Sequence, residues 1–395
     1  MVRELYGYSN STFRGRMEKM KTTEEQLLKE IDRLKEQMIL SIQELVQIKS
    51  VVGPKKEDAP YGEGPKAALL HTLKLAENLG FKTVNLDNQV GYAVYGDASD
   101  EDYIASVGHL DVVPEGDGWK YPPYSAKIKD GTMYGRGVLD NKGPIMTTLF
   151  ALAAIKNAGA KIKRPIRIVF GTDEETGKFR DIHHYLTQQK PPKYGFTPDC
   201  KYSVVYSERG RASVLLSVAK ENAQFLFDFV NHYFIGANNT GDRLGIDYYN
   251  EEYGTMEMRG YELQETEEFF TFKFVLSYPA GITIDEILEK ITEKAEKEKV
   301  ALKLLTNYEP VLFDKDSKMV KLLGETYEEI TGLDGTPVTT TGGTYAKMMP
   351  NIVPFGPSFP GQKGIGHQPN EWMNIEDLIT NAKIYTLALY RLSNL

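Results

Sequence analysis

From residue 83 to residue 210, short apolar runs typical of β-strands alternate with segments of helical character. The strand-like runs are TVNLDNQVGYAVYG, DYIASVGHLDVV, RPIRIVFG and KYSVVYSERG, and the helical segments among them are PIMTTLFALAAIKNAG and RDIHHYLTQQK. Such alternation favours an α/β layer structure with a largely parallel sheet, because each helix carries the chain back across the sheet. The fold class that we predict is therefore α/β.

After Gly210 the pattern changes to strands and helices typical of a small α+β unit, and the alternating pattern resumes near Asp314. A chain of 395 residues is also too long for one ordinary compact core. We expect an N-terminal arm at residues 1–20, a main domain formed by residues 21–210 and 314–395, and a small domain inserted at residues 211–313. Thr22-Thr23-Glu24-Glu25 fits a capping box and predicts the start of a long amphipathic helix.

Charge and composition exclude several kinds of partner. The net charge is −8 and the basic residues do not cluster, which argues against nucleic acid. No run approaches the roughly 18 apolar residues of a membrane helix, and the first residues lack the apolar stretch of a secretory signal. The single cysteine, Cys200, excludes an intrachain disulfide and fits a reducing compartment. We expect a cytoplasmic protein without membrane or nucleic-acid partners.

The stretch from Gly108 to Gly143 carries groups suited to a metal site. It holds His109, Asp111 and Asp140, all at predicted strand ends or in Gly-rich loops. Further candidates of the same kind follow along the chain: Glu174, Glu175, Asp199 and His367. In open α/β sheets, sites assemble at such strand ends. These residues are therefore candidates for one metal-binding site.

Each signal is weak by itself, since an acidic turn or a Pro-Asp pair is more often an ordinary solvated turn. The combination is stronger, because divalent ions need several carboxylates and a few imidazoles, whereas buried carboxylates otherwise repel one another. A site for two ions needs one shared carboxylate and at least two further ligands for each ion. The adjacent pair Glu174 and Glu175 also suits this chemistry, since one glutamate can bind metal while the other takes a proton from water.

Six segments in their order and spacing carry a family resemblance: GHLDVVP, GRGVLDNKGP, GTDEETG, TPDCKYSVVYSERG, GGTYAKMMPNIVPFGP and GHQPNE. The chain resembles the dinuclear-zinc metallopeptidases related to carboxypeptidase G and aminoacylase, and within them the dipeptidase V type. The resemblance covers the main domain almost throughout. It implies a zinc-peptidase-like catalytic domain with a mixed, largely parallel sheet, and an inserted lid domain.

The resemblance also implies a role for each candidate residue. Asp140 would bridge two zinc ions, for which Mn²⁺ or Co²⁺ are possible substitutes. His109 and Asp199 would complete one ligand set, and Glu175 and His367 the other. Asp111 would hydrogen-bond His109 and fix its tautomer, and Glu174 would be the general base.

Substrate contacts are expected from a second group of residues. Gly342, Gly343 and Thr344 would let backbone approach the substrate, and Arg209 is a candidate for a substrate carboxylate. We expect Cys200, one strand position from Asp199, to point away from the site and to serve packing.

The inserted segment departs from the dipeptidase V type. About half of its lid, including a His-Ala-Ser-Ala-Pro-like segment whose histidine stabilises the tetrahedral intermediate, has no counterpart in this sequence. The only lid histidine is His232, on an apolar and aromatic helix that favours a structural role. Ser277 stands where related enzymes have an arginine that clamps the substrate carboxylate, and a hydroxyl is a poor substitute for that fork of donors.

Three hypotheses follow. The first is a dinuclear zinc hydrolase that cleaves dipeptides or short N-acyl amino acids. The second is a metal-binding relative whose hydrolysis is impaired or lost, since one missing oxyanion donor costs about 10²- to 10³-fold in rate. The third is an amidohydrolase for N-acyl amines that lack an α-carboxylate. A lid of single size also makes a homodimer through the lid a plausible partner arrangement.

Overall fold

The computed structural model describes the backbone of residues 7–97 and 101–395, and the side chains from residue 23 onward except at 98–100. Its contacts divide the chain into two compact units. Unit 1 contains the described residues up to Val204, together with Asp316–Thr336 and Thr344–Leu395, and unit 2 contains Val205–Lys315 and Pro337–Gly343. We had predicted the domain boundaries at residues 210/211 and 313/314. The segment Pro337–Gly343 was not expected to group with the insertion.

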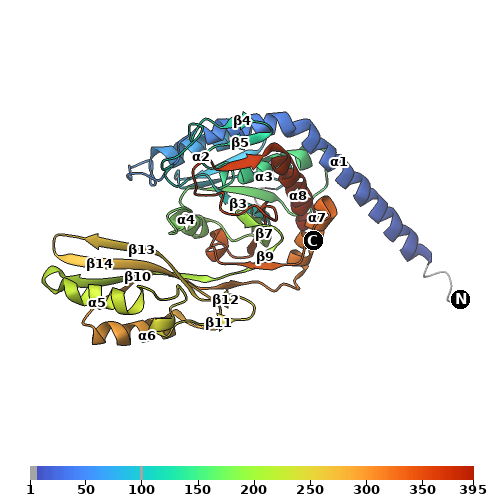
Figure 1. The fold of residues 1–395 in the computed structure, drawn as a ribbon. Helices are drawn as coiled ribbons and strands as arrows, with labels where there is room; N and C mark the ends of the chain where they lie inside the picture. The colour runs from blue at the N-terminus through green and yellow to red at the C-terminus, as the bar shows by residue number, and fades with distance from the viewer. Residues whose placement is uncertain (1–6, 98–100) are drawn as a thin grey trace. The chain divides into compact units, whose positions relative to one another are not determined.

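Unit 1 is built on a six-stranded mixed sheet, as predicted for the main domain (Figure 1). The strands, in spatial order, are β1 (Lys82–Leu86), β2 (Val90–Tyr95), β6 (Ile166–Gly171), β3 (Ile104–His109), β7 (Tyr194–Thr197) and β18 (Ile352–Pro354). The last four run parallel, whereas β1 and β2 form an antiparallel hairpin whose second strand pairs with β6. The mixed α/β class is thus confirmed.

Helices cover both faces of this sheet. They are α1 (Gly7–Val46), α2 (Glu63–Asn78), α3 (Lys142–Asn157), α4 (Arg180–Gln188), α7 (Lys318–Thr331) and α8 (Ile375–Asn394). Neighbouring strand residues show the two faces: a Cβ on Gly91 would meet Leu73 of α2, whereas the ring of Tyr92 packs against Tyr185 of α4. The same alternation on β3 points Gly108 toward Ile145 of α3 and His109 toward the opposite face.

The predicted start of α1 is wrong. The helix is already established from Gly7, so Thr23 and Glu24 lie within it instead of capping it. Of the predicted N-terminal arm, residues 1–6 lie outside the described residues and the rest belong to the backbone of α1. Glu24 instead pairs with Arg391 of α8 at 2.8 Å, which ties α1 to the last helix.

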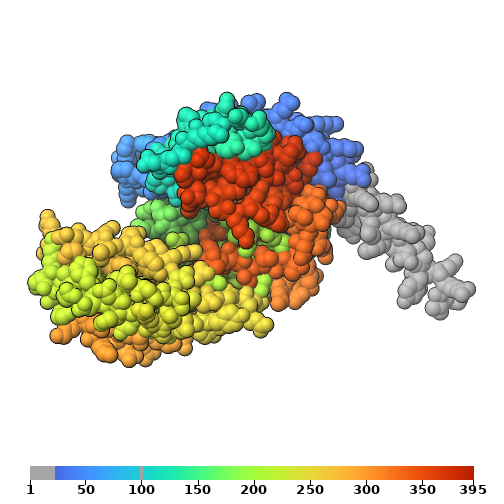
Figure 2. All heavy atoms as spheres, in the orientation of Figure 1, coloured from blue at the N-terminus to red at the C-terminus, as the bar shows by residue number. Residues whose placement is uncertain are grey.

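Shorter elements complete unit 1: β4 (Lys127–Lys129), β5 (Thr132–Tyr134), β8 (Cys200–Lys201), β19 (Pro357–Ser358), β20 (Trp372–Asn374) and the 3₁₀ turn Tyr345–Lys347. The loop before β20 is fastened to the loop before β4, because Asn370 accepts from the backbone N–H of Lys120 and donates to the carbonyl of Gly118. Figure 2 shows these two segments, teal and red, side by side on the surface.

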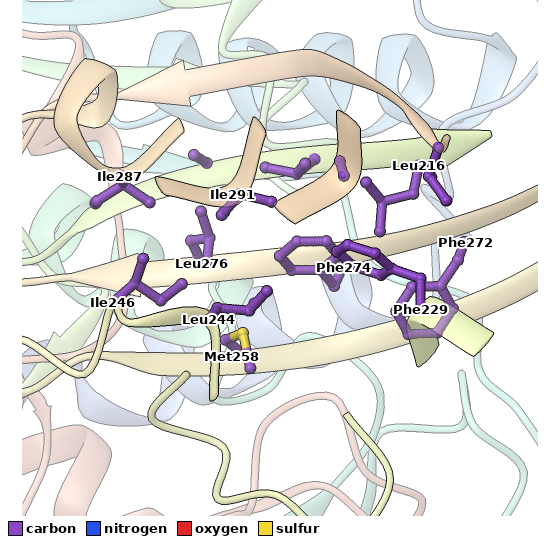
Figure 3. Close-up of a cluster of buried hydrophobic side chains, with 14 of the residues drawn as sticks. Leu216, Phe229, Leu244, Ile246, Met258, Phe272, Phe274, Leu276, Ile287 and Ile291 are labelled. Atoms are coloured by element: carbon purple, nitrogen blue, oxygen red, sulfur yellow. The ribbon is translucent and has the colours of Figure 1, made fainter. Parts of the chain in front are cut away.

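Unit 2 has its own four-stranded antiparallel sheet, in the order β13 (Glu257–Glu265), β14 (Phe269–Tyr278), β10 (Gly210–Ala219) and β15 (Ala301–Tyr308). Side chains on one face of β10 and β14 pack with α5 (Ala223–Tyr233) and α6 (Ile284–Lys297) into a hydrophobic core that includes Leu216, Phe229, Phe274 and Ile291 (Figure 3). The small strands are β9 (Val205–Glu208), β11 (Tyr249–Asn250), β12 (Gly254–Thr255), β16 (Val311–Leu312) and β17 (Val338–Thr340).

Within the described residues, no helix combines the length and the apolar character that crossing a membrane would require.

Candidate metal centre

The carboxyl ends of three parallel strands bring the predicted residues together. His109 is the last residue of β3, Glu174 and Glu175 follow the end of β6, and Asp199 follows the end of β7. Because parallel strands end at the same edge of a sheet, these side chains converge there. Two loops add Asp140, just before α3, and His367, just before β20.

The carboxylate of Asp140 lies between the two imidazoles. Its Oδ1 is 3.1 Å from Nε2 of His109, and its Oδ2 is 3.1 Å from Nε2 of His367. A second carboxylate accompanies each histidine: Asp199 lies 3.6 Å from His109, and Glu175 lies 2.9 Å from His367. The five side chains thus form two sets that share Asp140.

The tautomer of His109 is fixed by a backbone carbonyl. The ring is fully buried, and Nδ1 lies 2.9 Å from the carbonyl oxygen of Asp111. A carbonyl oxygen can only accept, so Nδ1 carries a hydrogen, and Nε2 is the nitrogen that can offer a lone pair to the cluster when the ring is neutral. The carboxylates of Asp199, Asp111 and Asp140 raise the pKa of His109 well above its usual value, so a metal ion would displace a proton from Nε2. The edge of Tyr345 packs against the same ring at a centroid distance of 6.2 Å.

The carboxylate of Asp111, which we predicted to hydrogen-bond His109, is bonded instead to the backbone that carries the two glutamates. One oxygen is 3.5 Å from Nδ1 of His109, longer than the bond that Nδ1 makes to the Asp111 carbonyl. The two oxygens accept the backbone N–H groups of Glu174, at 3.2 Å, and Glu175, at 3.0 Å. Asp111 therefore holds the turn that presents both glutamates.

Burial and mutual repulsion dominate the electrostatics of the cluster. Burial, together with the charge of Asp140, raises the pKa of Glu175 to about 7 and that of Asp199 to about 6. Burial also raises the pKa of Glu174 well above its usual range. The Asp140 and Glu175 carboxylates accept hydrogen bonds from the His367 ring and raise the pKa of His367 to about 11. Without a bound metal ion, the buried carboxyl groups therefore keep protons, which lower the repulsion among them.

The donor set fits divalent metal ions. Two groups of three side chains could each hold a metal ion: His109 with Glu174 and Asp199, and His109 with Asp140 and Glu175. In each group, one ligand atom from each residue lies within 4.8 Å of the other two. Oε1 of Glu175 is buried and has no hydrogen-bond partner among the described residues. A buried carboxylate oxygen without a donor is costly unless a cation satisfies it.

Asn141, which the sequence analysis did not single out, links three of these segments. Its Oδ1 accepts the backbone N–H of His109 at 3.2 Å, and its Nδ2 donates to the carbonyl of Pro198, next to Asp199, at 2.5 Å. The peptide bond that joins it to Asp140 is cis. The side chain therefore sets the spacing among three candidate ligands.

Glu371 was also missed, although it lies in the same loop region as His367. It is buried, its Oε2 pairs with the buried Arg136 at 2.7 Å, and its Oε1 accepts three backbone N–H groups: those of Gly137, Leu139 and Asp140, at 2.9 to 3.1 Å. This carboxylate holds the loop that presents Asp140. Glu371 ends GHQPNE, one of the six segments that carry the family resemblance, but the sequence does not show which backbone groups its carboxylate meets.

We expect Glu371→Gln to destabilise the chain by about 3 kcal/mol, because it leaves the buried Arg136 without a counter-charge. It should also weaken metal binding about 10- to 100-fold by loosening the Asp140 loop. Denaturant unfolding of chelator-treated protein and a metal titration measure the two effects. Glu376→Gln, an exposed position at the start of α8, is the control and should cost less than about 1 kcal/mol. Unchanged stability and affinity in Glu371→Gln would contradict this role.

The predicted substrate residues fall in different units. Gly342 and Gly343 belong to unit 2, whereas Thr344 opens the 3₁₀ turn of unit 1 and accepts the N–H of Ala346. Arg209, in unit 2, is largely buried and its guanidinium donates to the backbone carbonyls of Tyr253 and Thr255.

The other positions that we singled out from the sequence are Ser277, His232 and Cys200. Ser277 is buried and donates to the carbonyl of Thr341 within unit 2. His232 lies on α5 with an exposed ring, 3.3 Å from Glu298. Cys200 lies in the wall of a cavity of about 200 Å³ together with Asp140 and Asp199. The short strand β8 begins at Cys200 itself, so the strand alternation that we assumed does not extend back to Asp199.

Curated relatives align over most of the chain. The Bacillus subtilis protein named "Putative dipeptidase YtjP" is 28% identical over 463 residues, covering 92% of this chain and 99% of the relative. The Beta-Ala-Xaa dipeptidase of Lactobacillus delbrueckii subsp. lactis is 26% identical. The alignment covers 92% of this chain and 98% of that dipeptidase. Since 92% of 395 residues is about 363, roughly 100 of the 463 aligned positions hold no residue of this chain.

Solved structures share the fold at low sequence identity. Human carnosine dipeptidase 1 matches with a TM-score of 0.74 at 14% identity, over 94% of this chain and 99% of that one. The Bacillus subtilis YXEP protein, described as a dinuclear metal-binding peptidase of the M20 family, matches with a TM-score of 0.58 at 11% identity, over 92% and 100% of the two chains.

The family model of peptidases M20/M25/M40 matches residues 105–391, which include every candidate ligand described above. The chain therefore belongs to peptidase family M20/M25/M40.

Proposed function

We propose that this family M20 peptidase holds two divalent ions, most suitably Zn²⁺, and cleaves the amide bond of dipeptides or short N-acyl amino acids. The position of the Asp140 carboxylate carries the proposal. Its two oxygens face two different imidazoles, and each imidazole lies beside a further carboxylate. A carboxylate placed in this way suits a bridge between two ions. Mn²⁺ and Co²⁺ favour overlapping ligand types and are possible substitutes.

His109, Asp140 and Asp199 would hold one ion, and Asp140, Glu175 and His367 the other. Ions bound there polarise a carbonyl and lower the pKa of a water molecule. Glu174 is left to act on protons, since its buried carboxyl has a raised pKa that suits both accepting and returning one. It would take the proton from water as the C–O bond forms, and deliver it to the amine nitrogen as the C–N bond breaks.

The names of relatives support dipeptides as substrates. One relative is a Beta-Ala-Xaa dipeptidase, and one structural neighbour is a carnosine dipeptidase. Ser277 supports the alternative of N-acyl amines, because this buried hydroxyl already donates to a carbonyl in unit 2 and brings no positive charge for a substrate carboxylate.

A substrate panel separates these possibilities. Zinc-loaded protein should hydrolyse dipeptides and N-acyl amino acids faster than N-acyl amines. Turnover of N-acyl amines alone would overturn the dipeptide assignment. Two bound ions without turnover of any member would favour a metal-binding relative that has lost hydrolysis.

Metal affinity should rise with pH from about 5.5 upward, because ligands must lose their protons before they bind metal. In the metal-free site the raised pKa values keep protons on Asp199 up to about pH 6, on Glu175 up to about pH 7, and on His367 well above that. Calorimetric titrations in buffers of different ionisation enthalpy should therefore detect at least one proton released per ion. A pH-independent affinity without proton release would contradict the proposed ligand sets.

A further inference from the structure

The candidate ligand His367 stands on a short segment, Lys363–His367, that is fastened only at its ends. On one side, Gln362 accepts the backbone N–H of Phe359 at 2.9 Å and donates to Asp377 at 2.7 Å. On the other side, the Gln368 carbonyl accepts from Arg136, and Asn370 is bonded to the Gly118–Lys120 loop. Between these anchors, the polar contacts that the segment makes with the described residues are those of the His367 ring with Asp140 and Glu175.

Two residues of the segment have a left-handed backbone, and the segment borders open space. Gly364 has φ +66° and His367 has φ +63°, both in the left-handed region. A Cβ on Gly364 would have no atom within 4 Å. Two cavities, of about 200 and 320 Å³, border the segment and share Gln362, Gly364 and Ile365 in their walls. The segment can therefore move without displacing packed side chains.

The other histidine is held very differently. His109 is fully buried on β3, its ring is bonded to the Asp111 carbonyl, and its backbone N–H is bonded to Asn141. The side chain of His109 has no exposed surface, whereas the ring of His367 is 52% exposed. Freeing His109 would require part of the central sheet to open, but freeing His367 would require only a loop segment to swing out.

We propose that the two metal ions are held unequally: the ion bound with His367 leaves and enters through opening of the segment Lys363–His367, while the ion bound with His109 and Asp199 remains. The proposal rests on the two-metal function proposed above. It predicts that the chain passes through a defined one-metal state, because local openings differ in free energy across one structure and the least fastened element opens first.

Zinc release into excess chromogenic chelator tests this directly, without reference to activity. Wild-type protein loaded with two Zn²⁺ should release them in two phases of equal amplitude, separated by about tenfold or more in rate. His367→Ala should bind about one ion and release it in the slow phase. His184→Ala, which alters a half-buried histidine bonded to Asp87, is the matched control and should keep both phases.

Gly364→Ala tests the segment itself. An alanine in the left-handed region strains the closed segment and should speed the fast phase by roughly 5- to 30-fold, leaving the slow phase unchanged. Release of both wild-type ions at one rate, or an equal effect of Gly364→Ala on both phases, would overturn the inference while leaving a two-metal site intact. Wild-type protein that binds only one ion would overturn the two-metal function and the inference together.

Discussion

Replacing Glu174 with glutamine should lower kcat by about 10²- to 10⁴-fold while two metal ions stay bound. Glutamine has nearly the same shape but cannot accept a proton from water. The backbone N–H of residue 174 would still donate to Asp111, so the turn that carries Glu175 should keep its position. Steady-state hydrolysis of a dipeptide and metal analysis of the same preparation measure the two outcomes.

Glu175→Gln is the contrasting variant, because Glu175 lies against His367 and belongs to a proposed ligand set. It should lose metal as well as activity. If Glu174→Gln retained near wild-type kcat, or lost metal to the same extent as Glu175→Gln, the roles assigned to the two glutamates would be wrong.

Asp140→Asn should reduce bound metal below one ion per chain after dialysis and lower kcat/KM by more than about 10³-fold. The reason is that both proposed ligand sets share this carboxylate, and an uncharged amide cannot offer an anionic oxygen to each ion. Metal analysis and activity at saturating added zinc check the two parts. Asp117→Asn, an exposed loop position, should change neither. Retention of two tightly bound ions in Asp140→Asn would exclude the bridge.

Much of unit 1 could be predicted from local patterns. The alternation of apolar runs and helical segments predicted the mixed sheet, and strand ends predicted where His109, Glu174 and Asp199 would meet. The meeting itself is seen in the structure. Their roles as ligands and base stay predictions, because side-chain proximity does not distinguish a ligand from a proton carrier.

The supports of the site could not be predicted, because they are ordinary residues in special contacts. Asn141 and Glu371 act through hydrogen bonds to backbone groups of segments remote in sequence, and only the folded arrangement shows which amides they meet. The start of α1 was missed for another reason. Thr23 and Glu24 resemble a cap in sequence, but helical hydrogen bonding from Gly7 onward overrides that local preference.

Unit 2 folds around its own sheet. Its sheet and two helices form a hydrophobic core of their own. His232 pairs with Glu298 on its own unit. Pairing of two chains through the lid, which we predicted from the sequence, stays a prediction that light scattering at several protein concentrations would test.

Metal reconstitution tests the central claim most directly. Chelator-stripped protein would be titrated with Zn²⁺ while bound zinc and dipeptide hydrolysis are followed in the same samples. The two-metal account predicts no hydrolysis without metal, and activity that reaches its maximum at two ions per chain. Full activity without metal, or two bound ions with no hydrolysis of any dipeptide, would contradict it.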